Sequence, residues 1–219
     1  MFASEQTVMF AAGSLRLEGL LHRASGPDAV VITHPHPRYG GEMDNPVVSI
    51  LAGVYQRLGY TTLRFNFRGV GSSEGRYDDG RGEQDDVRGA AAYLTGLGRS
   101  PTDLAGYSFG AWINLRLDPP IAAIRRQLLV APPLAYLEFG AIAAPPEELV
   151  VIAGDRDEFA PLALLREQAP HWSPAVRLHV LSGVDHFYWG ALDRLSALVE
   201  AVLSSGADRT LADGFSPTG

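Results

Sequence analysis

The amino-acid sequence predicts an α/β protein with a mainly parallel sheet of about eight strands and helices on both faces. Short apolar runs alternate along the chain with segments whose apolar residues recur at helical spacing. Two of these runs, 29–33 and 149–153, are apolar or β-branched throughout, which is typical of strands buried on both faces. A third observation is the segment Gly106-Tyr107-Ser108-Phe109-Gly110, a glycine-flanked turn between an apolar run and a helical segment.

A chain of 219 residues is long enough for one domain with a full core. We expect a single domain over 1–206. Residues 207–219 are rich in Gly, Ser, Pro and Asp, so a flexible C-terminal tail with nothing to bury is expected there. With 46% hydrophobic and 20% charged residues, the composition is that of an ordinary globular protein.

Charge and cysteine content disfavour several functional classes. The net charge of −7 argues against nucleic acid and against anionic membrane surfaces as partners. Cysteine is absent, which excludes disulfides, thiolate catalysis and cysteine-based zinc sites. Residues 1–13 lack the basic and apolar regions of a signal peptide, and no apolar run approaches the ~18 residues that span a bilayer. A cytoplasmic location with no membrane partner is therefore expected.

The first part of the chain is predicted to form an antiparallel hairpin followed by strand–helix units. Four strands are expected here, over 7–10, 15–23, 29–33 and 61–67. Between the last two lies a helix that Asn45 caps, Pro46 begins and Gly59 ends. A second helix follows the fourth strand, and Glu83 and Asp85 in its first turn suit the positive end of the helix dipole.

The second part of the chain continues the strand–helix alternation. Four further strands are expected, over 102–105, 127–131, 149–153 and 176–181. Helices are expected over 111–115, which Pro119-Pro120 stops, over 161–168 and around 192–202. Because sites in parallel sheets form beyond the carboxyl ends of the strands, catalytic residues are expected at those ends.

Ser108 is the candidate nucleophile. A G-x-S-x-G turn between strand and helix holds the central hydroxyl at the top of the sheet, beside the N-terminus of the helix. Positive dipole and free N–H groups can stabilise an oxyanion there. The motif alone is weak, because glycine-rich turns often contain a serine. The catalytic interpretation therefore depends on finding a base and an acid elsewhere in the chain.

His186 is the candidate base. His22 and His179 fall inside predicted strands, and His171 falls in a polar loop, so these are interpreted as structural or solvated. His186 lies just beyond the last strand, where a loop can bend the imidazole back over the sheet edge. In the serine–acid–histidine order, the acid should follow the strand 149–153. Three carboxylates qualify by position, namely Asp155, Asp157 and Glu158.

Taken together, these segments resemble the α/β-hydrolase superfamily. The matching segments are the Ser108 turn, Gly154-x-x-Asp157-x-x-Ala160-Pro161, Asp185-His186-Phe187 and Arg68-Gly69-Val70-Gly71-Ser72-Ser73. More narrowly, three segments resemble the small, lidless serine hydrolases related to dienelactone hydrolase: His34-Pro35-His36-Pro37 with Gly40-Gly41, Phe65-Asn66-Phe67-Arg68-Gly69, and Gly82-Glu83-Gln84-Asp85-Asp86. The resemblance covers 15–203.

The resemblance implies an α/β-hydrolase fold without a cap domain, and it implies that Asp157 is the acid. Dienelactone hydrolases themselves use a cysteine nucleophile, whereas this chain has Ser108 and no cysteine. The interval 132–147, where caps are inserted in this superfamily, holds only 16 residues, four of them proline. So short a segment is too small to fold as a cap with its own core.

The oxyanion hole requires two N–H donors, and Phe109 directly after the nucleophile is expected to supply one. The second should come from the loop after 29–33, where the prolines have no N–H. Four candidates remain in that loop, His36, Arg38, Tyr39 and Gly40, and the resemblance points to the backbone of His36. A metal site at His34 and His36 is disfavoured because no third ligand with suitable spacing is nearby.

The sequence thus predicts a carboxylesterase that cleaves small carboxylic esters through an acyl-enzyme, with no cofactor and no metal. We expect an open rim around the site and substrate contacts from Tyr39, Tyr136 and Phe187. Arg68 is expected to pair with a carboxylate at the start of a helix rather than to bind substrate. Two other functions remain open, an acyl thioesterase and a catalytically silent binding protein with the same fold. Both a monomer and a homodimer are compatible with the sequence.

Overall fold

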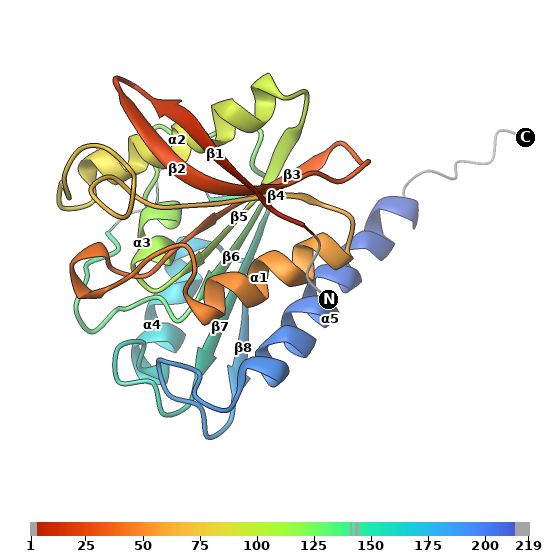
Figure 1. Cartoon of the computed structure of the whole chain (residues 1–219). Helices are drawn as coiled ribbons and strands as arrows, with labels where there is room; N and C mark the ends of the chain where they lie inside the picture. The colour runs from red at the N-terminus through yellow and green to blue at the C-terminus, as the bar shows by residue number, and fades with distance from the viewer. Residues whose placement is uncertain (1–3, 141, 143–144, 213–219) are drawn as a thin grey trace, which may run out of the picture.

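The computed structural model describes residues 4–140, 142 and 145–212. They form one eight-stranded sheet in the order β1-β2-β4-β3-β5-β6-β7-β8 (Figure 1). The strands are β1 (Gln6–Ala12), β2 (Leu15–His22), β3 (Asp28–Thr33), β4 (Thr61–Phe65), β5 (Ser100–Tyr107), β6 (Arg126–Val130), β7 (Glu148–Gly154) and β8 (Arg177–Leu181). β1 pairs antiparallel with β2, and β2 with β4, whereas the other neighbouring strands run parallel. The predicted fold class is confirmed.

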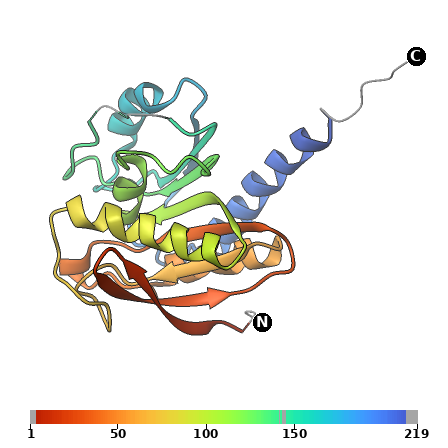
Figure 2. The ribbon, with the colours of Figure 1, turned by 90° about the horizontal axis from the view of Figure 1, so that it is seen from above.

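Helices cover both faces of this sheet. They are α1 (Pro46–Arg57), α2 (Arg81–Gly96), α3 (Phe109–Leu115), α4 (Leu162–Trp172) and α5 (Leu192–Ala212), with a short 3₁₀ helix, η1, over Pro37–Tyr39. α1 and α5 pack against each other on one face, and α2, α3 and α4 lie on the other (Figures 1 and 2). Among the described residues, no helix is long and apolar enough to cross a bilayer.

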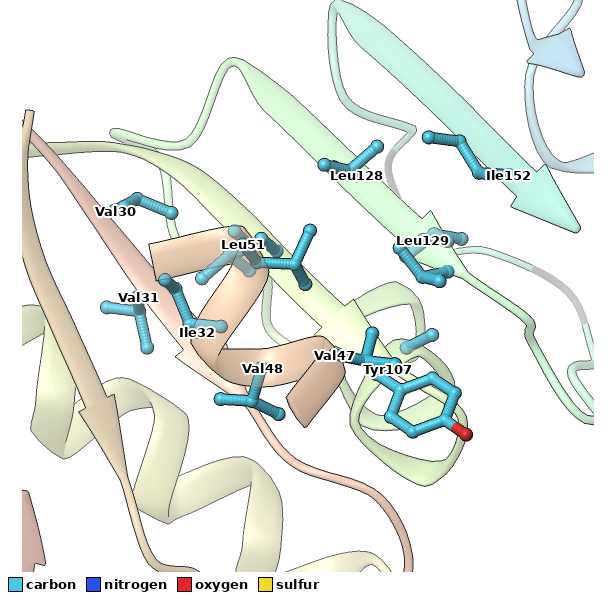
Figure 3. Packing of buried hydrophobic residues seen from close by; sticks show 14 of the residues in the cluster. Val30, Val31, Ile32, Val47, Val48, Leu51, Tyr107, Leu128, Leu129 and Ile152 are labelled. Carbon is cyan, nitrogen blue, oxygen red and sulfur yellow. The ribbon is translucent and has the colours of Figure 1, made fainter. Parts of the chain in front are cut away.

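α1 illustrates why the predicted elements form. The Asn45 side chain accepts a hydrogen bond from the Val47 N–H at 2.9 Å, Pro46 occupies the first turn, and Gly59 beyond the end has a φ of 84°. Val47 and Leu51 are almost completely buried over the central strands (Figure 3). Each fully buried aliphatic side chain of this kind contributes about 1.5–3 kcal/mol, so the helix is held by its packed face.

The structure differs from the sequence prediction at two helix ends. α5 continues to Ala212, so residues 207–212 of the expected tail are helical, and residues 213–219 lie outside the described residues. Once a helix has formed, each further residue adds one backbone hydrogen bond without a new nucleation cost, so a polar composition need not end it at 206. α4 extends through Pro170 to Trp172, which places His171 in a last helical turn instead of a loop. Burial of Trp172 favours this extension despite the missing proline N–H.

No cap domain is present in the described part of the chain between β6 and β7. Residues 131–140, 142 and 145–147 form turns and extended segments without a helix or strand. The Trp112 indole N–H of α3 donates to the Glu138 carbonyl at 2.8 Å, which holds this connection against the body of the domain. The described part of this connection packs on the body of the domain, with Phe139 buried in the common core, and it adds no second core.

The segment 68–73 has a structural role. The guanidinium of Arg68 pairs with Asp86 of α2, with 2.7 Å between Nη2 and Oδ1, and Asp86 is completely buried. Ser73 Oγ donates to the Asn66 carbonyl at 2.7 Å. The Arg68–Asp86 pair holds the loop after β4 against α2, and the Ser73–Asn66 hydrogen bond closes the loop on itself. Arg68 thus pairs with a carboxylate near the start of α2, as predicted, although Asp86 lies in the second turn of that helix.

Candidate active site

Ser108 occupies a strained turn between β5 and α3. Its φ is 55° and its ψ is −116°. Residues other than glycine rarely adopt a positive φ, so this backbone conformation is strained. A Cβ on Gly106 would lie 2.7 Å from the Ala111 nitrogen, and one on Gly110 would lie 2.6 Å from the Thr33 carbonyl oxygen. Both glycines are required because α3 approaches β5 and β3 this closely. The motif therefore has the backbone geometry that holds a serine hydroxyl at the end of the sheet.

Ser108, His186 and Asp157 form a continuous chain of hydrogen bonds. The distance from Ser108 Oγ to His186 Nε2 is 3.0 Å, and His186 Nδ1 lies 2.9 Å from Asp157 Oδ2. All three residues are almost fully buried, with exposed fractions of 7% or less. A carboxylate only accepts, so the proton of the neutral imidazole resides on Nδ1 and leaves Nε2 free to accept from the serine.

The structure distinguishes the three candidate acids, and Glu158 is exposed to solvent. Of these, Asp157 contacts His186, and its Oδ1 also accepts the N–H groups of Phe159 and Ala160, both at 2.8 Å. Asp155 instead accepts the Ser182 hydroxyl at 2.9 Å and the Gly183 N–H, and these hydrogen bonds lower the pKa of its exposed carboxyl. Asp155 therefore holds the turn after β8, outside the hydrogen-bonded chain.

Two residues position the His186 loop, although the sequence analysis assigned no role to either of them. A Cβ on Gly154 would lie 2.0 Å from the Val184 carbonyl oxygen, so only glycine permits the loop to pass this close to the end of β7. The Tyr107 hydroxyl donates to the His186 carbonyl at 2.7 Å. Burial raises the pKa of Tyr107, which keeps the hydroxyl protonated as a donor. The sequence carries no signal for this role of Tyr107, because the serine motif specifies only its two glycines and its serine.

The loop after β3 narrows the choice of the second oxyanion donor. The N–H of Tyr39 donates to the His36 carbonyl at 3.0 Å, and the N–H of Arg38 donates to His36 Nδ1 at 3.2 Å. The backbone N–H groups of Tyr39 and Arg38 are therefore engaged within the loop. Of the four candidates for the second oxyanion donor, the N–H groups of His36 and Gly40 remain. The His36 ring lies 4.8 Å from the Phe109 ring between centroids, so this loop packs directly on the Ser108 turn.

His34 has a structural role at the end of β3. Its Nε2 accepts from the Phe67 N–H at 3.0 Å, and its Nδ1 donates to the Pro35 carbonyl at 2.6 Å. Burial lowers its pKa to about 4, so the ring is neutral at pH 7. Both ring nitrogens are engaged, and no group of three side chains that could hold a metal occurs among the described residues.

The buried His34 predicts an acid-sensitive stability. Below pH 6.5 the unfolded chain binds a proton on His34 that the folded chain accepts only near pH 4, so stability is lost as the pH falls through this interval. Between pH 7.5 and pH 4.5 the free energy of unfolding should fall by about 2–3 kcal/mol more in the wild type than in His34→Asn. Urea unfolding at both pH values measures this difference, and equal falls would contradict it.

The three predicted substrate contacts lie in exposed positions around the buried serine. Tyr39, Tyr136 and Phe187 are 87%, 69% and 55% exposed. Tyr39 packs on His36 at 4.8 Å between ring centroids, and Phe187 meets the His186 ring edge-on at 5.6 Å. Tyr136 lies 5.0 Å from the ring of Phe159, a residue that the sequence analysis passed over.

Comparison with known proteins adds a family assignment to this geometry. Residues 30–218 match the family model described as the alpha/beta hydrolase family. The chain belongs to the α/β-hydrolase family. This α/β-hydrolase is 33% identical over 187 residues to an uncharacterised protein of Rickettsia prowazekii, covering 79% of this chain and 78% of the relative.

Two solved structures resemble this α/β-hydrolase along most of its length. An α-β serine hydrolase homologue from Coxiella burnetii is 33% identical, with a TM-score of 0.79 over 93% of this chain and 98% of that chain. An α/β serine hydrolase without a lid from Xanthomonas campestris is 28% identical, with a TM-score of 0.83 over 92% of this chain and 94% of that chain. The predicted resemblance to lidless members of the family is thereby confirmed.

Proposed function

We propose that this α/β-hydrolase is a serine hydrolase that cleaves small carboxylic esters. One observation carries the proposal: Ser108 Oγ lies 3.0 Å from His186 Nε2, and Asp157 holds the opposite nitrogen of that ring. Such a chain of serine, neutral imidazole and carboxylate is the apparatus of acyl transfer. The buried position of the three groups strengthens their electrostatic interaction because little water screens it.

In the first half of the reaction, Ser108 Oγ attacks the ester carbonyl carbon and a new carbon–oxygen bond forms. The serine proton passes to His186 Nε2, and the carbonyl oxygen becomes an oxyanion. The N–H of Phe109 and the backbone N–H of His36 are proposed to donate to this oxyanion. The intermediate then collapses, the bond to the alcohol oxygen breaks, and His186 returns the proton to that oxygen.

In the second half, water takes the place of the alcohol. His186 accepts a proton from the water as its oxygen attacks the acyl carbon of the ester on Ser108. Collapse of the second oxyanion releases the carboxylic acid and restores the serine hydroxyl. Asp157 stays ionised throughout and stabilises the imidazolium that forms in each half.

A fluorophosphonate probe tests the proposal directly. We expect one probe molecule per chain, attached to Ser108 in a mass-spectrometric peptide map, together with turnover of p-nitrophenyl acetate. A chain that takes up no probe and hydrolyses no ester would be a binding protein with this fold. Matched oxygen and thiol esters of the same acyl group separate an esterase from a thioesterase, because the proposal requires higher kcat/KM on the oxygen ester.

The open surroundings of Ser108 predict a preference for short acyl groups. No cap lies over the site in the described residues, and Tyr39, Tyr136 and Phe187 form an exposed rim with no deep apolar channel built from a second domain. We expect kcat/KM to be greatest on acetyl and butyryl esters and to fall for acyl chains of about ten carbons or more. Selectivity for long chains, with a rate that rises sharply above the substrate's micelle concentration, would contradict this prediction.

A further inference from the structure

We infer that Phe159 is a positioning residue, which holds the His186 imidazole and stabilises its protonated form during acyl transfer. Phe159 is partly buried, and its ring stacks on the imidazole with 4.4 Å between centroids and 24° between planes. The inference rests on the proposed ester hydrolysis, and it assigns a role to a side chain outside the hydrogen-bonded chain of Ser108, His186 and Asp157.

The backbone of Phe159 is anchored on both sides. Its N–H donates to Asp157 Oδ1 at 2.8 Å, and its carbonyl accepts from the Ala135 N–H at 3.0 Å. The ring also packs on Tyr136 at 5.0 Å and meets Phe187 edge-on at 5.9 Å between centroids. One residue thus contacts the acid through its main chain and the base through its side chain, with little freedom to move.

Stacking of this kind favours the reacting state. When Ser108 transfers its proton, the neutral ring becomes a cation, and the negative face of a stacked aromatic ring attracts a cation. The interaction is stronger in the protonated intermediate than in the resting enzyme, so it raises kcat. A flat ring at 4.4 Å also limits rotation of the imidazole away from Ser108 Oγ.

Phe159→Leu tests the inference, because leucine keeps apolar cover over the imidazole and removes only the aromatic face. We expect kcat for p-nitrophenyl acetate to fall about tenfold, with a smaller change in KM. The acid limb of the kcat/KM profile should move to lower pH, since the protonated imidazole loses a stabilising neighbour. Asp157 is hydrogen-bonded to the His186 ring, and the Tyr107 ring lies 5.5 Å from it between centroids. Asp185 precedes His186 in the chain and Tyr188 packs on Tyr107, and all four titratable groups are unchanged in this variant.

Two further variants make the result specific. Phe159→Tyr retains the stacking ring, so this variant should keep both kcat and the acid limb of the pH profile at their wild-type values. Phe139→Leu is the matched control, because Phe139 stacks on Trp172 at 4.9 Å and 25° without contacting the site, and it should leave the pH profile in place. If Phe159→Leu does not fold, as judged by circular dichroism, Phe159→Met makes the same comparison.

The outcomes separate this inference from the proposed function. An active wild type with an unshifted acid limb in Phe159→Leu overturns the positioning role alone. A rise in KM without a fall in kcat also overturns it, because a residue that only touches the acyl group would behave in that way. A wild type that neither hydrolyses esters nor reacts with a fluorophosphonate overturns the proposed function, and this inference with it.

Discussion

Ser108→Ala is expected to lower kcat for ester hydrolysis by about 10⁴-fold or more, while the protein stays folded. The hydroxyl is the only nucleophile proposed at the end of β5, and its removal leaves His186 with no proton to accept there. Alanine and serine have the same Cβ, so the strained φ of 55° is not made worse by the substitution. The remaining activity would come from direct attack of water on the bound ester, with the oxyanion donors stabilising the intermediate.

The control for this experiment is a serine that lies outside the site. Ser72 is exposed in the loop after β4, so Ser72→Ala should keep both ester hydrolysis and fluorophosphonate labelling. Circular dichroism melts of both variants check that the fold is retained. Hydrolysis by Ser108→Ala at a rate near that of the wild type would refute the proposed nucleophile.

Asp157→Asn is expected to lower kcat by about 10³–10⁴-fold, and the hydrogen bonds around Asp157 explain why. The N–H groups of Phe159 and Ala160 favour a carbonyl oxygen at the position of Oδ1. The NH₂ group of the asparagine then takes the place of Oδ2, 2.9 Å from His186 Nδ1. A donor at this position favours the tautomer with the proton on Nε2, which is unable to accept from Ser108.

Asp155→Asn is the matched control for the acid, since it makes the same change two residues earlier. Asp155 is exposed and contacts Ser182 and Gly183, so its loss should loosen the turn after β8 and lower kcat less than about tenfold. Steady-state kinetics of both variants on one ester measure the contrast. A larger effect from Asp155→Asn would identify Asp155 as the residue on which His186 depends.

The prediction of the fold from sequence succeeded where the determining signals are local. The Asn45 cap, Pro46 and the periodic apolar face of α1 lie within a few turns of each other, and the structure shows the helix at that place. Continuous apolar runs predicted the central strands for the same reason. Helix ends were less accurate, as at Pro170 in α4, because burial of Trp172 in the tertiary fold decided where that helix stops.

By itself, the sequence determined the Ser108 turn, because two glycines around a serine between a strand and a helix are what a tight turn with close backbone approach requires. It also limited the acid to three neighbouring carboxylates and identified one histidine beyond the last strand. The family resemblance favoured Asp157 among those carboxylates, and the tertiary structure places Asp157 against His186. Only the tertiary structure revealed Tyr107, Gly154 and Phe159 as supports of the His186 loop. The reason is physical, because the carboxyl ends of the parallel strands β5, β7 and β8 lie at the same end of the sheet. The contacts made there join residues that are 29 or 79 positions apart in the sequence, and such contacts leave no periodic or local pattern in the chain.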